Sequence, residues 1–330
     1  MESSQDSDDV RARLEKLKTY LGRHYGIKIV GLERLDRGVY RVDRSDGPTW
    51  VARIFRARRP IEQVEGDAEV LRFLEENDFP AERCACPNPV STPGGSGVLV
   101  TRFVEGTPPD QSERTLRALG EVLGRLNTLP EGTGGVARDA GSLHHYSPAG
   151  GGPRREIDAA ASWLDEVEDK VPAKNRAPFD LLRKQLVAAD DCHGLPLALV
   201  HPDPVPKNVI AKPDGGLVMV DWTGAGRGPR LVPLALLIWA SAAGKDGWSL
   251  DRVDPVVAGY CSRVSLGREE LARLANVMRV RPLIFACRRY HHAMIAGEQP
   301  DGTEWWMPSE ELVDSISARA LSAFERELRK

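Results

Sequence analysis

Two different periods of hydrophobic and polar residues divide the chain. Between residues 27 and 55, apolar side chains recur at about every second position in three short runs, IKIVGLERL, GVYRVDR and TWVARIF, and an SDGP turn separates the last two. This alternation is typical of strands with one buried face, so it predicts a small antiparallel sheet. Helices are expected beside the sheet at about 8–20 and 61–77, followed by a further strand, GVLVTRFV, at 97–104.

The segment EGTPP at 105–109 combines glycine and proline, which interrupt both strands and helices. It predicts a boundary between an N-terminal lobe, residues 1–104, and a C-terminal lobe, residues 105–330. Beyond this boundary the helical period dominates. The expected helices cover residues 111–129, 155–170, 177–190, 230–243, 251–263, 267–296 and 309–329.

One stretch of the C-terminal lobe, residues 197–222, departs from the helical period. Within it, NVIA and LVMVDW flank the turn KPDGG, whose Asp-Gly pair is typical of a tight hairpin. Folding the chain back at Asp214 places Asn208, at the start of one strand, opposite Val220 and Asp221 at the end of the other. The hairpin thus brings together an amide and a carboxylate, which are hard oxygen ligands of the kind that Mg²⁺ prefers.

The hairpin follows a proline-rich loop, LVHPDPVPKNVI, in which His201, Asp203 and Asn208 have the spacing HxDxxxxN. Kinase chemistry uses this spacing for an aspartate that accepts a hydroxyl proton and an asparagine that holds magnesium. So short a pattern also recurs by chance, and the alternative is a solvated turn capped by Asp203 and Asn208. The context of the loop must therefore decide between the two interpretations.

The composition excludes several classes of protein. The 330 residues are 41% hydrophobic and 28% charged, and 45 Lys+Arg against 48 Asp+Glu give a net charge of −3. This balance provides no attraction to nucleic acid or to an anionic membrane. The start is acidic and polar, unlike a secretory signal, and no later stretch is apolar for long enough to span a bilayer. A cytoplasmic protein is expected.

The five cysteines form an odd set without CxxC spacing, which predicts reduced thiols rather than a disulfide framework. Cys84 and Cys86, together with Cys192 and His193, are an alternative set of zinc ligands, but their spacing suits zinc poorly. Buried or incidental thiols are the preferred interpretation.

Taken together with the hairpin and with VDWTGAGRGP at 220–229, the loop resembles that of the aminoglycoside phosphotransferase family, relatives of the protein kinases that phosphorylate small molecules. The resemblance implies an α+β, bilobal, protein-kinase-like fold, with a small antiparallel-sheet N-lobe and a larger, mostly helical C-lobe. It also implies ATP and Mg²⁺ as cofactors. Asp203 would be the base that orients the acceptor hydroxyl, Asn208 and Asp221 would hold the metal, and His201 would brace the loop.

The resemblance also implies a nucleotide site in the small lobe. The family's phosphate-anchoring lysine falls at Arg53 and its helix glutamate at Asp67, a pair that would preserve an ion pair of similar reach. Helical spacing sets Asp67 beside the apolar stripe of its helix. Adenine would contact the backbone carbonyl of Arg102 and the backbone N–H of Val104, and Gly38 would allow a turn to approach the phosphates.

Three further positions differ from the family pattern. Pro202 replaces a glycine between the histidine and the aspartate of the loop, and Asn127 replaces a frequent histidine in a helix of the second lobe. Pro233 replaces an aspartate that ties down the catalytic loop, so that a supporting bond is expected to be missing.

The acceptor is expected to bind in the helical lobe, where SLHHY at 142–146, CRRYHH at 287–292 and GEQPDGTEWW at 297–306 combine aromatic and charged groups. Tyr290, His291 and His292 are the preferred candidates, and the arginines beside them leave anionic and neutral acceptors open. The leading hypothesis is a kinase of a small-molecule hydroxyl, with antibiotic modification as the first guess. The alternative is a nucleotide-binding sensor without turnover. The residues do not choose between ATP and GTP, or between magnesium and manganese.

Overall fold

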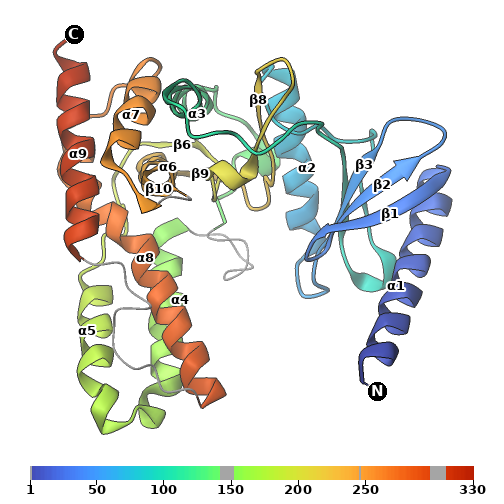
Figure 1. Ribbon diagram of the computed structural model, residues 1–330, viewed down its shortest axis with the longest axis horizontal. Helices are drawn as coiled ribbons and strands as arrows, with labels where there is room; N and C mark the ends of the chain where they lie inside the picture. Colours follow the sequence, from blue (N-terminus) through green and yellow to red (C-terminus); the bar gives the residue numbers. More distant parts are fainter. Residues whose placement is uncertain (1, 142–151, 245–246, 298–309) are drawn as a thin grey trace.

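The computed structural model describes residues 2–141, 152–244, 247–297 and 310–330. Its N-terminal lobe is a five-stranded antiparallel sheet in the order β1-β2-β3-β5-β4. The strands are β1 (Ile29–Asp36), β2 (Val39–Arg44), β3 (Trp50–Ile54), β4 (Val90–Ser91) and β5 (Val98–Arg102). Helix α1 (Glu2–Tyr25) lies on one side of this sheet and α2 (Ile61–Glu76) on the other (Figure 1).

Alternation along β5 explains how both faces of the sheet are covered. Val98 and Val100 are buried in the cluster that contains Leu17 and Leu21 of α1, whereas Leu99 belongs to the cluster that contains α2. Successive side chains of a strand point to opposite faces, so one apolar strand serves two helices. The cluster on the α2 side continues into the C-terminal lobe, and the two lobes therefore share a core.

The C-terminal lobe is larger and mostly helical. Its helices are α3 (Glu113–Asn127), α4 (Gly152–Val167), α5 (Arg176–Val187), α6 (Leu231–Ala242), α7 (Val253–Cys261), α8 (Arg268–Ala296) and α9 (Glu310–Leu328). Its strands are β6 (Leu197–Val200), β7 (Val209–Ala211), β8 (Leu217–Met219), β9 (Gly226–Pro229), β10 (Ala243–Gly244) and β11 (Gly247–Trp248), paired as β6-β9, β7-β8 and β10-β11. Short 3-10 turns lie at Pro93–Gly95, Gly134–Val136, Glu168–Lys170, Ala173–Asn175, Pro206–Asn208 and Leu250–Arg252.

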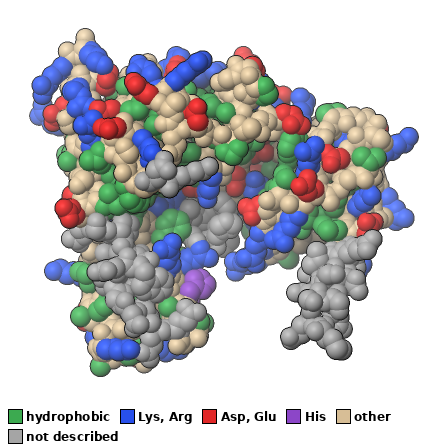
Figure 2. Space-filling model, viewed as in Figure 1, with side chains coloured by type: hydrophobic (Ala, Val, Ile, Leu, Met, Phe, Trp, Pro, Cys, Tyr) green, Lys and Arg blue, Asp and Glu red, His purple; other side chains and the backbone are tan. Residues whose placement is uncertain are grey.

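The helical lobe has two cores. Helices α3, α6, α7 and α9 contribute to the large cluster that also holds α2, whereas α4, α5 and part of α8 form a second cluster around Phe179 and Tyr290. In Figure 1, α4, α5 and the end of α8 project downward, separated from the small lobe. Figure 2 shows the hollow between these two regions, with Lys and Arg side chains on both of its sides.

The expected α+β arrangement, a small antiparallel sheet followed by a larger helical lobe, is confirmed. All the expected helices are present in the described residues, and the predicted β7-β8 hairpin forms with Asn208 accepting a backbone hydrogen bond from Val220 at 2.9 Å. The short strands β4, β6, β9, β10 and β11 were not predicted, because two to four residues are too few to show a period.

The five cysteines all lie in the described part of the chain, where each is a free thiol. Within the described ranges, three or more His, Cys, Asp or Glu side chains nowhere gather in a way that could hold a metal ion. Nor does any described helix have both the length and the hydrophobicity needed to cross a membrane.

Candidate active site

The proline-rich loop brings its aspartate and asparagine into direct contact. Asn208 is 8% exposed, and its Nδ2 donates to Asp203 Oδ2 at 2.9 Å and to the Asp203 backbone carbonyl at 2.8 Å. Lys207 Nζ lies 3.3 Å from the same carboxylate oxygen, but the lysine side chain is largely exposed. Because the amide nitrogen of Asn208 is engaged with Asp203, its amide oxygen is the atom left for an external ligand.

His201 connects this loop to the end of the hairpin. Its Nδ1 accepts the backbone N–H of Asp203 at 3.1 Å, and its Nε2 lies 3.0 Å from the carbonyl oxygen of Val220. Since Nδ1 is an acceptor, Nε2 carries the proton and donates it to Val220. The ring is fully buried, and this burial lowers the pKa of His201 below its usual range. The neutral imidazole thus links Asp203 to the residue that precedes Asp221.

Asp221 follows β8 in a conformation that is rare for an aspartate. Its φ is +67°, in the left-handed region. Its backbone N–H donates to Oε1 of Glu82 at 2.7 Å, and its Oδ1 lies 3.0 Å from Nη1 of Arg53. Its carboxylate therefore sits between the hairpin and β3, and Asn208 lies directly before the paired strand β7.

Glu82 is a residue of this site that the sequence analysis did not find. It is 8% exposed, and its second oxygen, Oε2, accepts the hydroxyl of Thr101 on β5 at 2.9 Å. Its backbone N–H donates to Met219 of β8 at 3.0 Å. Burial raises the pKa of Glu82, while the charge of Arg53 opposes that shift. One carboxylate thus connects the strand expected to contact adenine with the residue expected to hold the metal.

The expected ion pair between Arg53 and Asp67 is wrong. Arg53 pairs with Asp221, whereas Asp67 accepts from Arg59 Nη2 at 2.6 Å and from Arg138 Nη2 at 2.5 Å. Arg53 lies on β3, and among the described residues its guanidinium pairs with the carboxylate of Asp221.

Asp67 has a different place in the site. It is fully buried, as the spacing predicted, and its Oδ1 also accepts the backbone N–H of Gly224 at 3.0 Å. Arg138 in turn donates to the carbonyls of Gln63 and Ala225, at 2.7 and 2.9 Å. This network fixes α2 to the segment that follows Asp221.

The small lobe places the expected nucleotide residues along β1-β2, β3 and β5. Gly38 occupies the β1-β2 turn with φ +74°, and a side chain there would lie 2.8 Å from the carbonyl oxygen of Ile54, so the fold itself requires glycine. Arg102 ends β5, and its N–H donates to Arg83. Among the described residues, the N–H of Val104 has no protein acceptor.

The three preferred acceptor residues have different environments. Tyr290 is 1% exposed and packs against Phe179 in the second core, which makes it a packing residue in this conformation. His291 Nε2 lies 3.0 Å from a carboxylate oxygen of Glu166 on α4, and His292 is exposed. The other two candidate segments, 142–146 and most of 297–306, lie outside the described residues.

The positions that differ from the family pattern are accommodated in the helical lobe. Asn127 Nδ2 donates to the carbonyl of Leu199 at 3.1 Å, and its Oδ1 accepts the hydroxyl of Tyr260 at 3.0 Å. Asn127 thus supports the strand that leads into the loop. Pro233 lies buried in the first turn of α6, where a missing N–H breaks no helical hydrogen bond.

The donor set of the site fits a magnesium ion. The amide oxygen of Asn208 and the carboxylate of Asp221 are both hard oxygen donors, and Mg²⁺ takes few protein ligands beside phosphate oxygens and water. Asn208 and Asp221 belong to the two paired ends of one hairpin, because the N–H of Val220 bonds to Asn208.

Comparisons with known proteins agree on the fold. A family model described as the phosphotransferase enzyme family matches residues 27–274. Amicoumacin kinase hAmiN, solved with AMP-PNP, Ca²⁺ and Ami, has a TM-score of 0.64 at 13% identity, with 96% of each chain covered. Choline kinase LicA from Streptococcus pneumoniae has a TM-score of 0.58 at 15% identity, covering 96% of this chain and 99% of that one. An aminoglycoside-3'-phosphotransferase of type VIII has a TM-score of 0.55 at 20% identity, covering 82% and 99%. No curated protein matches the sequence.

Proposed function

The chain belongs to the phosphotransferase enzyme family, and on that premise we propose that it transfers the γ-phosphate of ATP to a hydroxyl group of a small molecule. The observation that carries this proposal is the contact between Asn208 and Asp203 beside Asp221, which gathers a proton acceptor and two oxygen ligands at one end of a hairpin. Phosphoryl transfer asks little covalent chemistry of the protein, so positioning and charge neutralisation supply most of the acceleration.

Asp203 is the base in this proposal. Its carboxylate accepts a hydrogen bond from the acceptor hydroxyl and orients the oxygen for in-line attack on the γ-phosphorus. Asn208 fixes the direction of that carboxylate through the 2.9 Å hydrogen bond, and the neutral His201 holds the backbone N–H of Asp203. The hydroxyl proton passes to Asp203 as the new P–O bond forms and ADP leaves.

Magnesium, when bound, would neutralise the phosphate charge, with Asn208 and Asp221 as its protein ligands. Arg53 would contact the phosphates, since its guanidinium already lies beside Asp221. The N–H of Val104 and the carbonyl of Arg102 would contact the adenine, and Gly38 would let the β1-β2 turn approach the phosphates. Asp67 has an indirect part here, because it fixes α2 to Gly224.

The acceptor class is a wider question. The similar structures include kinases of amicoumacin and choline and an aminoglycoside phosphotransferase, so an antibiotic or a metabolite alcohol are both natural first choices. Burial lowers the pKa of Arg288 on α8, and the positive charge of Arg56 in the small lobe lowers it further. Basic groups of both lobes are therefore close enough to interact. Anionic and neutral hydroxyl compounds therefore belong in a screen beside the cationic ones. Use of ATP as the donor is consistent with a location in the cytoplasm. The boundary between the two lobes is proposed to lie at residues 104 and 105.

The experiment is a screen of hydroxyl-bearing compounds with Mg-ATP, following acceptor-dependent release of ADP. With an active compound, Asp203→Asn should lower kcat at least about a hundredfold while Mg-ATP still binds. Asp214→Asn is the matched control, because it makes the same change at the exposed turn of the hairpin that follows the loop and should keep full activity. Full turnover by Asp203→Asn would refute the assignment of the base. Nucleotide binding without stimulation by any compound would favour the sensor.

A further inference from the structure

The catalytic loop is short of its own hydrogen-bond donors. Pro202, Pro204 and Pro206 each lack a backbone N–H, so three of the residues around Asp203 donate nothing to the loop. The described backbone bonds inside it run from Val205 to Asp203, from Asn208 to Val205 and from Val209 to Pro206. The carbonyls of such a loop need donors from other elements if the loop is to keep one conformation.

Arg281 of α8 supplies a donor of this kind. Its Nη2 donates to the carbonyl oxygen of Pro202 at 2.7 Å, one residue before Asp203. Arg281 is 8% exposed, so its guanidinium is largely desolvated where it makes this contact. A buried charge is retained only when a counter-charge and hydrogen bonds compensate for its lost hydration.

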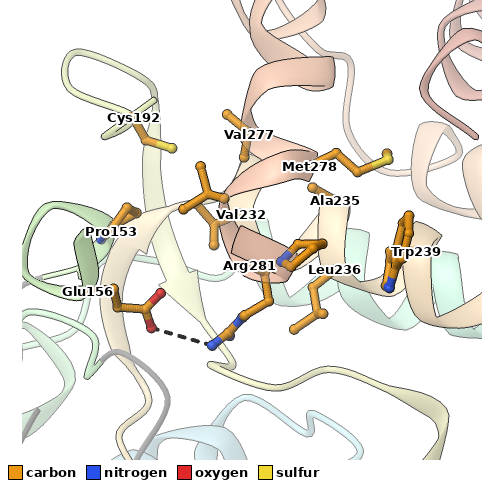
Figure 3. A pocket seen from close by; sticks show the side chains of 12 residues that line it. Pro153, Glu156, Cys192, Val232, Ala235, Leu236, Trp239, Val277, Met278 and Arg281 are labelled. Atoms are coloured by element: carbon orange, nitrogen blue, oxygen red, sulfur yellow. Dashed lines mark hydrogen bonds and ion pairs between the residues drawn. The ribbon is translucent and has the colours of Figure 1, made fainter. Parts of the chain in front are cut away.

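The counter-charge is Glu156 of α4. Glu156 is 6% exposed, and its Oε1 lies 3.4 Å from Nη1 of Arg281. Figure 3 shows the two side chains reaching toward each other at the edge of a small cavity. The cavity measures about 20 Å³, room for one water molecule, and Val232, Leu236 and Val277 are among its apolar lining. Burying an arginine and a glutamate in such surroundings carries a desolvation penalty that lowers the free energy of unfolding. This penalty argues that the pair has a specific role.

We propose that Arg281, balanced by Glu156, is a positioning residue that fixes the backbone at Pro202 and thereby sets where the carboxylate of Asp203 lies. This inference rests on the proposed function, in which Asp203 is the base. Pro233 of α6 cannot make the supporting bond expected at its position, and the bond from Arg281 of α8 holds the loop at Pro202 instead. Helices α4 and α8 also belong to the second core, so the tie connects the projecting helices to the reacting group.

The test separates positioning from folding by replacing both members of the pair. Arg281→Met alone removes the positive charge beside the buried carboxylate of Glu156 and is expected to lower the stability of the protein. The double variant Arg281→Met/Glu156→Met removes both charges and keeps the volume apolar, so it should fold as stably as the wild type. Its kcat should fall about tenfold to a hundredfold, because a small displacement of the base is costly, while KM for ATP stays unchanged. Arg281→Lys, which can still donate to Pro202, should recover part of the loss.

The matched control is Arg279→Met on the same helix, where the arginine is exposed and pairs with Asp314 of α9. It should change neither kcat nor loop dynamics. Hydrogen exchange of residues 201–208 gives a second readout that needs no acceptor: exchange should be faster in the double variant and unchanged in Arg279→Met. A double variant with wild-type kcat or wild-type exchange in this loop overturns the proposal. If the wild type turns over no compound, the proposed function fails, and the exchange result alone then decides whether Arg281 holds the loop.

Discussion

Replacing Glu82 with alanine is the perturbation that tests the described site most directly. The carboxylate accepts the backbone N–H of Asp221 at 2.7 Å and, at 2.9 Å, the hydroxyl of Thr101, which is 4% exposed. The alanine leaves two donors without an acceptor. It also releases Asp221 from the contact that accompanies its left-handed φ of +67°.

The expected magnitude follows from these contacts. A hydrogen bond to a charged group contributes about 1.5–3 kcal/mol, so two of them give about 3–6 kcal/mol. Burial raises the pKa of Glu82, which means that desolvation of the carboxylate already opposes part of this gain. We therefore expect Glu82→Ala to lower the free energy of unfolding by about 2–4 kcal/mol. Removing a residue that supports a metal ligand typically lowers metal affinity by about 10–100-fold. The Glu82→Ala protein should therefore bind Mn²⁺ more weakly by a similar factor.

The assay combines denaturant unfolding with titration of the protein–ATP complex by Mn²⁺, which can be followed spectroscopically. Glu82→Gln is the conservative variant, because its amide oxygen can still accept the N–H of Asp221 and should retain most of the metal affinity. Glu75→Ala is the control, because the Glu75 side chain is 45% exposed and its Oε1 lies 3.9 Å from Arg83 Nε. A surface ion pair of this kind contributes little to stability. If Glu82→Ala binds Mn²⁺ as tightly as the wild type, Glu82 does not hold Asp221 in place and the reasoning is wrong.

Three other predictions concern titratable side chains of the site. Asp67→Asn should lower the free energy of unfolding by about 3–5 kcal/mol in a denaturant titration, because two arginines lose their counter-charge. The folded pKa of His201 lies below its value of 6.5 in a free chain, so the stability it contributes is present above about pH 6.5 and is lost as the pH falls from there through the folded pKa; the His201→Gln variant should show a flatter profile of Tm against pH than the wild type. Arg53→Ala should raise KM for ATP about tenfold or more in steady-state kinetics, whereas Arg53→Lys should keep part of the affinity.

The fold was largely predictable because its elements have long, regular patterns. The helix expected at 267–296 is observed at Arg268–Ala296, and the strand expected at 97–104 is observed at Val98–Arg102. Each has enough apolar positions for its period to stand out. Strand β9, in contrast, has the sequence GRGP, and its pairing with β6 is a tertiary event that leaves no periodic signal.

The loop and hairpin were predictable for a related reason, which is that their partners lie close together in the sequence. Asn208 and Asp203 are separated by five positions, and a single turn at Asp214 brings Asp221 beside them. The pairing of Arg53 was not predictable in this way. From residue identity alone, both Asp67 and Asp221 could pair with Arg53. The structure pairs it with Asp221, because Asp67 on α2 is engaged with Arg138, a residue far along the chain.

The residues that the sequence analysis missed share one property: each is a charged side chain whose partner lies in a distant element. Glu82 contacts Asp221 across 139 positions, and Arg281 contacts Pro202 across 79. A faint signal exists for Arg281, because it interrupts the apolar run VRPLIFAC of a buried helix, and a charge there must find a partner or weaken the core. Glu82 likewise is a charged residue that directly follows three apolar ones, Phe79, Pro80 and Ala81. A charge within an apolar segment thus predicts that a buried contact exists. It does not predict the partner, because long-range packing sets the distance between the two groups.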